Sequence, residues 1–307
     1  MADRSAQRLS MRLRPAINAA AGFLTVGALK TIRLINRNVM ADFTGALLRR
    51  VGPWLPEHRV GRANLTAAFP DKSPEEIEAI LRGVWDNLGR VAAEFAHIDR
   101  FKTYDPARPG PFDIEYDQAT FDRFHRLRLD GKPALIFTAH LANWELTGRV
   151  AHDYKLDTAI VYRRPNLGAV ADAVIKIRAG SMGNLVSTGL DTPFKLKRTL
   201  EAGGHVAMLV DQYNVQGIEV NFFGRKTKAN PLLARLARHV DCPIHGARVI
   251  RLPNHRFRAE LTDAIAPVRD ADGQIDVQKT MQVITDVVEG WVREYPEQWL
   301  WVHRRWR

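Results

Sequence analysis

The sequence predicts an α/β fold, with a mixed central sheet that is flanked by helices and preceded by a helical amino-terminal region. Short apolar runs bounded by turn residues, typical of buried strands, alternate with stretches whose apolar residues recur at helical spacing. The chain has 307 residues and is 46% hydrophobic, which is ample for one large core. We therefore expect a folded protein without repeats or extended disorder.

The amino-terminal segment, residues 1–37, combines positive charge with an apolar run. The uncharged stretch from residue 15 to residue 29 is shorter than the roughly 20 apolar residues of a spanning helix, and it contains Asn18. Basic residues flank it: Arg4, Arg8, Arg12, Arg14, Lys30, Arg33 and Arg37. We expect the segment to associate with a membrane surface and to favour its anionic cytoplasmic leaflet. An ordinary amphipathic helix packed on the core explains the pattern equally well.

Residues 38–110 are predicted to form a helical region. Ser73-Pro74-Glu75-Glu76 is a capping box with proline at the first helical position. Apolar residues then recur at helical spacing: Ile77, Ile80, Leu81, Val84, Trp85 and Leu88. The polar, proline-containing segment 101–110 is predicted to be a loop that separates this region from an α/β domain at 111–307.

Within that domain, strands and helices alternate. After the strand that begins at residue 133, strands are predicted at 158–162, 205–210, 244–250 and 257–261, the last two as a hairpin. Helices are predicted at 167–178, 232–239 and from Met281 to Val292.

A pair of catalytic candidates follows the strand 133–139. His140 comes directly after this apolar run, and Glu145 lies five residues later. An imidazole whose second nitrogen is held by a carboxylate is a better proton acceptor for a substrate hydroxyl, so we expect His140 to be a general base and Glu145 to fix it. Asn143, between them, can cap the following helix and line the site.

Polar residues follow two further predicted strands and are candidates for substrate binding. Arg163 and Arg164 come after the strand 158–162, where guanidinium groups can hold phosphate, although one of them can point elsewhere. Asp211 and Gln212 follow the strand 205–210, and Asp211 can orient a substrate or cap a turn.

A second group of candidates lies further along the chain. Arg225 lies in a cluster of aromatic and basic residues, from Phe222 to Lys228, that suits a ligand with phosphate and acyl parts. Arg248 and Arg251 have opposite parity on their strand, so only one of them readily faces a site.

Charge and cysteine content narrow the class of partner. The formal net charge is +11 and the isoelectric point is near 10.0, which favours anionic partners without choosing among them. Cys242 is the single cysteine, so an internal disulfide is excluded, and no Cys/His spacing resembles a zinc site. We expect no metal and no cofactor.

The motifs together resemble one family. They are Asn64–Pro70, Trp85–Phe95, His140-x4-Glu145, Tyr162–Asn166, Asp211-Gln212, Phe222–Arg225 and Tyr295–Trp306. In order and spacing the chain is similar to the late, or secondary, acyltransferases of bacterial lipid A biosynthesis, within the wider lysophospholipid acyltransferases that carry His-x4-Asp/Glu.

This resemblance implies a glycerolipid acyltransferase-like fold. It also implies transfer of an acyl chain from acyl carrier protein to a hydroxyl of a phosphorylated glycolipid, a lipid A precursor of the Kdo-lipid IVA type, at the cytoplasmic face of the inner membrane. Acyl-chain length, the hydroxyl that is used and the oligomeric state do not follow from the sequence.

Three alternatives are open. The acceptor can be another glycolipid or a lysophospholipid. Ala179-Gly-Ser181-Met-Gly183 matches a variant nucleophile elbow of serine esterases, although a helix rather than a strand is predicted before Ser181. The charge and the aromatic cluster at Phe222 also suit a nucleic-acid binder, but no nucleic-acid-binding motif is present, so we expect no nucleic-acid partner.

Overall fold

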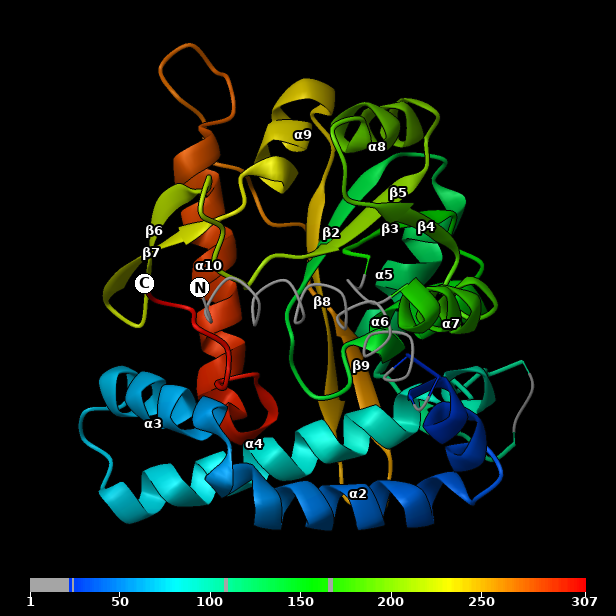
Figure 1. The fold of residues 1–307 in the computed structure, drawn as a ribbon. Coiled ribbons are helices and arrows are strands. Elements are labelled where there is room, and N and C mark those ends of the chain that lie inside the picture. Colours follow the sequence, from blue (N-terminus) through cyan, green and yellow to red (C-terminus); the bar gives the residue numbers. More distant parts are fainter. Residues whose placement is uncertain (1–21, 24, 108–109, 165–167) are drawn as a thin grey trace, which may run out of the picture.

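The structure is a computed structural model that describes residues 22–23, 25–107, 110–164 and 168–307. A mixed sheet of seven strands forms its centre, in the order β1-β9-β8-β2-β5-β3-β4 (Figure 1). Strands β8, β2, β5, β3 and β4 are parallel, whereas β9 is antiparallel to β8 and parallel to β1. The predicted α/β class with a mixed sheet is confirmed.

Five strands lie close to the predicted bounds: β2 (Ala134–Thr138), β3 (Thr158–Tyr162), β5 (His205–Leu209), β8 (Ile244–Arg251) and β9 (Phe257–Leu261). The sheet also contains two short strands that the sequence did not predict, β1 (Ile114–Glu115) and β4 (Asn184–Ser187). A separate antiparallel hairpin, β6 (Ile218–Phe222) and β7 (Arg225–Ala229), was not predicted. Its turn uses Phe223 and Gly224, both at positive φ, and charged residues hide the strand pattern of β7.

Helices cover both faces of the sheet (Figure 1). Helices α5 (Gln118–Leu129) and α6 (Glu145–Asp153) pack on one face through a buried apolar cluster. Helices α8 (Thr192–Glu201), α9 (Leu232–Val240) and α10 (Val277–Glu294) pack on the other face through a second cluster. Helix α7 (Gly168–Ala179) leads into the edge strand β4. The tail contains the short 3₁₀ turn η3 (Pro296–Gln298).

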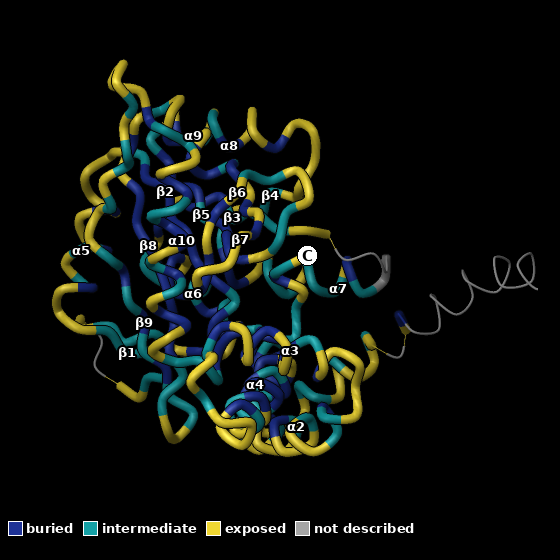
Figure 2. Tube along the Cα trace, turned by 90° about the vertical axis from the view of Figure 1, so that its left-hand side faces the viewer, coloured by how far each residue is buried: buried dark blue, intermediate teal, exposed yellow. Residues whose placement is uncertain are grey.

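The amino-terminal helices lie across one end of the sheet (Figure 1). They are α2 (Arg37–Val51), α3 (Pro56–Ala68) and α4 (Pro74–Phe95), with the 3₁₀ turns η1 (Gly52–Trp54) and η2 (Ile98–Arg100). Ser73 and Glu76 form the predicted capping box of α4. A Cβ on Gly89 would lie 2.2 Å from the Thr44 oxygen, so glycine permits the close approach of α2 to α4. Figure 2 shows α4 buried and the outer side of α2 exposed.

The proposed membrane segment, residues 1–37, lies largely outside the described residues. Of its described part, residues 22–23 and 25–32 are in helical turns. Among the described helices, none is long and apolar enough to cross a membrane. The domain boundary at residue 110 stays a prediction.

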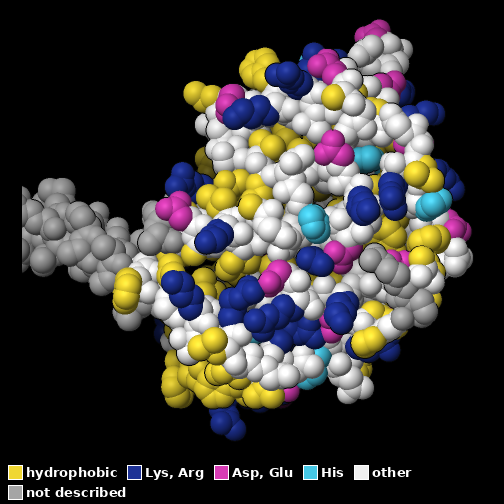
Figure 3. Space-filling model, turned by 90° about the vertical axis from the view of Figure 1, so that its right-hand side faces the viewer, with side chains coloured by type: hydrophobic (Ala, Val, Ile, Leu, Met, Phe, Trp, Pro, Cys, Tyr) yellow, Lys and Arg dark blue, Asp and Glu magenta, His cyan; other side chains and the backbone are white. Residues whose placement is uncertain are grey.

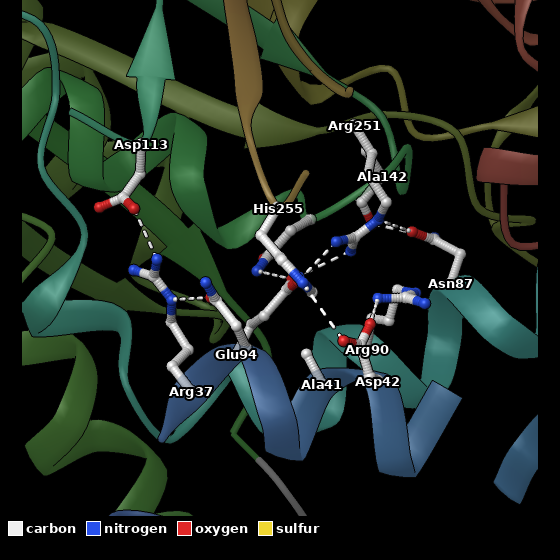
Figure 4. A network of polar contacts seen from close by, with 12 residues as sticks. Arg37, Ala41, Asp42, Asn87, Arg90, Glu94, Asp113, Ala142, Arg251 and His255 are labelled. Carbon is white, nitrogen blue, oxygen red and sulfur yellow. Dashed lines mark hydrogen bonds and ion pairs between the residues drawn. The ribbon is translucent and has the colours of Figure 1, made fainter. Parts of the chain in front are cut away.

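A buried polar network joins the amino-terminal helices to the sheet (Figure 4). Arg251, at the end of β8, forms two hydrogen bonds with the Glu94 carboxylate of α4, at 2.5 and 2.9 Å. Asn87, two turns earlier on α4, accepts from Arg251 Nε and donates to the Ala142 carbonyl. The charges of this pair are stabilised because each finds partners, whereas either one alone would be costly to bury.

Replacing Arg251 by methionine should lower the free energy of unfolding by about 3–5 kcal/mol, because Glu94 would keep a buried charge without its partner. Urea denaturation followed by circular dichroism measures this change. The control is Arg123→Met, which removes an ion pair to Asp263, an 80% exposed side chain, and should cost less than about 1 kcal/mol. Equal losses in the two variants would contradict the importance given to the network.

Candidate active site

The site is built where two neighbouring parallel strands end. Thr138, the last residue of β2, lies beside Leu209, the last residue of β5. Two residues beyond the end of each strand come His140 and Asp211. The Asp211 carboxylate accepts from His140 Nδ1 through Oδ1, at 2.8 Å, and from the His140 backbone N–H through Oδ2, at 2.8 Å. Parallel pairing therefore brings together two residues that are 71 positions apart in the sequence.

The backbone turns sharply after His140. The Leu141 N–H donates to the Ala139 carbonyl, at 2.7 Å, and Ala142 has a positive φ of 47°. The tail holds this turn from outside, because the Ala142 N–H donates to the Gln298 carbonyl, at 2.8 Å, and the Leu300 N–H donates to the His140 carbonyl, at 3.2 Å. A non-glycine residue at positive φ is uncommon and needs such support.

Asp211 remains ionised although it is buried. Burial alone would raise its pKa, but the His140 imidazole, the His140 backbone N–H and the Trp299 indole stabilise the carboxylate and lower the pKa to about 2. An ionised acceptor at Nδ1 favours the tautomer that carries its proton there, so Nε2 has a free lone pair. The Gln212 amide lies 3.2 Å from this Nε2 and can donate to it.

Glu145 has a different partner from the one expected. Its carboxylate binds Arg178 of α7, with Nη2 at 2.5 Å from Oε1 and Nε at 2.9 Å from Oε2, and accepts from the Trp144 indole at 3.1 Å. The expectation that Glu145 fixes the imidazole is wrong for this structure. Glu145 begins α6, so its side chain points along a helix that leaves the strand end, while Asp211 follows the neighbouring strand.

A cavity of about 380 Å³ opens beside His140. Its polar lining includes His140, Glu145, Arg163, Arg178 and Gln212. Apolar side chains of the sheet, of helices α5 and α6 and of the segments before β3 and β4 line the rest, among them Phe124, Ile136, Val150, Leu156, Ile160, Met182, Val249 and Leu261.

The cavity follows the strands. Thr138 and Thr158 both line it. Thr138 pairs with Leu209, the last residue of β5, and Thr158 pairs with His205, the first residue of β5, so the two threonines are offset by four residues along the sheet. At about 3.3 Å for each residue, the cavity extends about 13 Å along the sheet.

A family model of bacterial lipid A biosynthesis acyltransferases matches residues 8–307. The chain belongs to this family. A comparison with curated proteins gave no match. The resemblance of the sequence motifs is thus confirmed at the level of the family, and the chain is an acyltransferase of lipid A biosynthesis.

The other predicted residues of this acyltransferase divide into two groups. Arg163 lines the cavity, whereas Arg164 is exposed and pairs with Asp172, so one arginine of the two points elsewhere as expected. Arg248 lines the cavity and Arg251 binds Glu94, as their opposite parity predicts.

The prediction that Asn143 binds the ligand is wrong, whereas that for Arg225 stays a prediction. Asn143 is fully buried and its amide donates to Glu94, at 2.9 Å, so it neither lines the cavity nor caps α6 with its side chain. Arg225 lies at the exposed start of β7 and is not among the residues that line the cavity. Its guanidinium lies over the Trp306 ring, 4.7 Å from the ring centroid.

Ser181 does not have the surroundings of an esterase nucleophile. It is buried, with 1% of its surface exposed, and it follows the end of α7 rather than a strand. The Gly183 that follows has a positive φ of 77°, as expected for a turn after a helix. In the described part of the chain, no group of three or more His, Cys, Asp or Glu residues could hold a metal ion.

Sequence reasoning missed two residues of the site. Arg178 was placed only at the end of a predicted helix, because its contact with Glu145 spans 33 positions. Trp299 lies within the tail motif Tyr295–Trp306, and the structure adds a hydrogen bond from its indole to Asp211 Oδ2, at 2.8 Å. The signals available in the sequence for the ion pair were Glu145 at the start of one helix and Arg178 at the end of the next.

The pKa of Asp211 predicts how stability depends on pH. Because this pKa falls from the ordinary 3.8 to about 2 on folding, the ionised carboxylate should contribute on the order of 2 kcal/mol above pH 4, and this contribution should disappear as the pH falls towards 2. Urea denaturation of the wild type and Asp211→Asn at several pH values measures the difference. It should shrink below pH 4, and a difference that stays constant down to pH 3 would contradict the assignment. The exposed Asp172→Asn serves as the control.

Proposed function

We propose that the protein transfers an acyl group from acyl carrier protein to a hydroxyl of a lipid A precursor of the Kdo-lipid IVA type, with His140 as the general base. One observation carries the proposal: Asp211 holds Nδ1 of an imidazole that lines a largely apolar cavity, which leaves Nε2 as a proton acceptor. The family supports the reaction class and the lipid A pathway.

The proposed reaction is a direct transfer. The acceptor hydroxyl replaces the Gln212 amide at His140 Nε2 and gives up its proton as its oxygen attacks the thioester carbonyl. The tetrahedral intermediate collapses with cleavage of the C–S bond, and the imidazolium returns the proton to the leaving thiolate. The Asp211 carboxylate stabilises the imidazolium between these steps. No acyl-enzyme is required, because the thioester is already activated and positioning is the main demand.

The cationic groups at the cavity suit an anionic acceptor. Arg163 lines the cavity close to the carboxyl end of β3, where it can bind a phosphate of the glycolipid. The Glu145–Arg178 pair is nearly buried in the same wall and keeps one side of the cavity in a fixed shape. Backbone amides at the start of α6 are candidate donors to the oxyanion.

The apolar depth of the cavity suits a fatty acyl chain. Much of its lining, including Phe124, Leu156 and Leu261, consists of apolar side chains of the second core cluster. Burial of methylene groups there contributes about 0.8 kcal/mol each, so the chain itself can position the thioester at His140. The net charge of +11 favours an acidic carrier protein as donor.

The outer face of α2 and its flanking turns, which we call the α2 apolar face, suits a membrane surface. Of the twelve large apolar side chains exposed in the described chain, eight lie between residues 23 and 55: Phe23, Leu34, Ile35, Val39, Phe43, Leu47, Trp54 and Leu55. Figure 3 shows apolar side chains gathered at the end of the molecule formed by α2, with Lys and Arg nearby. Apolar residues with basic neighbours such as Arg49 and Arg50 favour an anionic bilayer. We propose peripheral attachment at the cytoplasmic face of the inner membrane.

The test of the base is His140→Ala, which should remain folded and lose at least about 100-fold in transfer rate, because proton removal from the hydroxyl would fall to water. Mass spectrometry of the acylated lipid A precursor after incubation with acyl carrier thioester measures the rate. The control is His239→Ala, on the exposed side of α9, which should retain wild-type activity. Near-normal transfer by His140→Ala would refute the proposal.

The test of the α2 apolar face is the double variant Phe43→Asp/Trp54→Asp, at side chains that are 61% and 82% exposed. Its binding to vesicles of phosphatidylethanolamine and phosphatidylglycerol should weaken by at least about tenfold, because two apolar contacts are lost and negative charge is added. Co-sedimentation measures it. Leu129→Asp/Leu190→Asp, at side chains that are 64% and 100% exposed and lie outside α2, should bind like the wild type, and equal weakening of both double variants would contradict the assignment.

A further inference from the structure

The tail of the chain wraps around the His140–Asp211 pair. Leu141 and Trp299 form an isolated antiparallel β-bridge, and the Leu300 N–H donates to the His140 carbonyl. The Trp299 indole N–H donates to Asp211 Oδ2, at 2.8 Å. Trp299 and Asp211 are both buried, with 2% and 4% of their surfaces exposed, so this hydrogen bond is not replaced by water.

We propose that Trp299 is a positioning residue of the site, because its indole holds Asp211 Oδ2 and so keeps Oδ1 on His140 Nδ1. This role rests on the proposed function of His140 as the base. The two oxygens of Asp211 have separate tasks: Oδ1 receives the imidazole, whereas Oδ2 receives the indole N–H and the His140 backbone N–H. A carboxylate held at both oxygens cannot rotate about its Cβ–Cγ bond without losing several hydrogen bonds.

The indole can perform this task because its own ring is fixed. Trp299 packs edge-on against Trp301, with ring centroids 4.7 Å apart, and against Phe222, at 5.5 Å. These neighbours come from the tail and from β6, so the donor direction is set by packing that involves no group of the site. A donor fixed in advance needs no reorganisation during the reaction.

Trp299 acts behind Asp211 rather than on the substrate. The residues that line the cavity include His140 and Gln212 but neither Asp211 nor Trp299. Loss of the indole N–H should therefore affect the imidazole and the chemical step, and leave the binding of the acceptor almost unchanged.

The chain offers a matched control in the same segment. Trp301 is fully buried and also donates one indole hydrogen bond, to the Pro296 carbonyl at 2.7 Å, away from the pair. Phenylalanine at either position removes one indole N–H and a similar volume from the same aromatic cluster. A general loss of packing should therefore affect both variants, whereas a positioning role belongs to Trp299 alone.

The experiment compares Trp299→Phe with Trp301→Phe by steady-state kinetics and by NMR of the chain labelled with ¹⁵N-histidine, with His140→Gln to assign the His140 signals. Trp299→Phe should lower kcat about tenfold with KM within twofold. It should also weaken or abolish the His140 Nδ1–H resonance and mix the two tautomers. Trp301→Phe should retain both the resonance and kcat within about twofold.

Equal effects of the two substitutions, or an unchanged Nδ1–H resonance in Trp299→Phe, would overturn the positioning role. The resonance reports the hydrogen bond whether or not His140 is the base, so failure of the proposed function, seen as activity of His140→Ala, is distinguishable from failure of this inference. Should Trp299→Phe not fold, Trp299→Tyr and Trp301→Tyr give the same comparison with a larger side chain.

Discussion

The position of the His140 imidazole depends on the parallel pairing of β2 with β5. Because Thr138 and Leu209 are in register, the residues two places beyond them meet at one edge of the sheet, where Asp211 receives both the side chain and the backbone N–H of His140. A shift of one residue in this register would turn each strand residue to the other face and separate the pair. The core residues that hold the register, such as Leu135 and Val206, thereby contribute to the site without lining its cavity.

Segments from both ends of the chain support this edge. Helix α4 supplies Asn87 and Glu94, which bind the carbonyl of Ala142 and the amide of Asn143. The tail supplies Gln298, whose backbone carbonyl accepts from both Asn87 and Ala142 and whose side chain binds the backbone of Arg251. The turn after His140 thus lies between two buried layers. This arrangement explains why aromatic and polar residues of the tail, including Arg305 at 1% exposure, are in the interior rather than at a lipid surface.

The charges of the chain have several uses. Arg251 and Arg178 neutralise buried carboxylates, Arg163 lines the cavity, and Arg49 and Arg50 are exposed near the α2 apolar face. Each internal pair also takes up one carboxylate, so the net charge of +11 is carried by the remaining side chains. The aromatic and basic cluster around Phe222 likewise serves the interior in part. It forms a hairpin in which Phe222 is in the core and Arg225 covers Trp306.

The α/β class, the strands β2, β3, β5, β8 and β9, the capping of α4 and the place of His140 directly after a buried strand all follow from the sequence, because local periodicity and turn chemistry carry that information. The sequence did not determine the partner of the imidazole. Glu145, close in sequence, was expected, but tertiary structure gave this task to Asp211 and paired Glu145 with Arg178. Partners 71 and 33 positions apart meet only through the order of strands in the sheet, and no local pattern encodes that order.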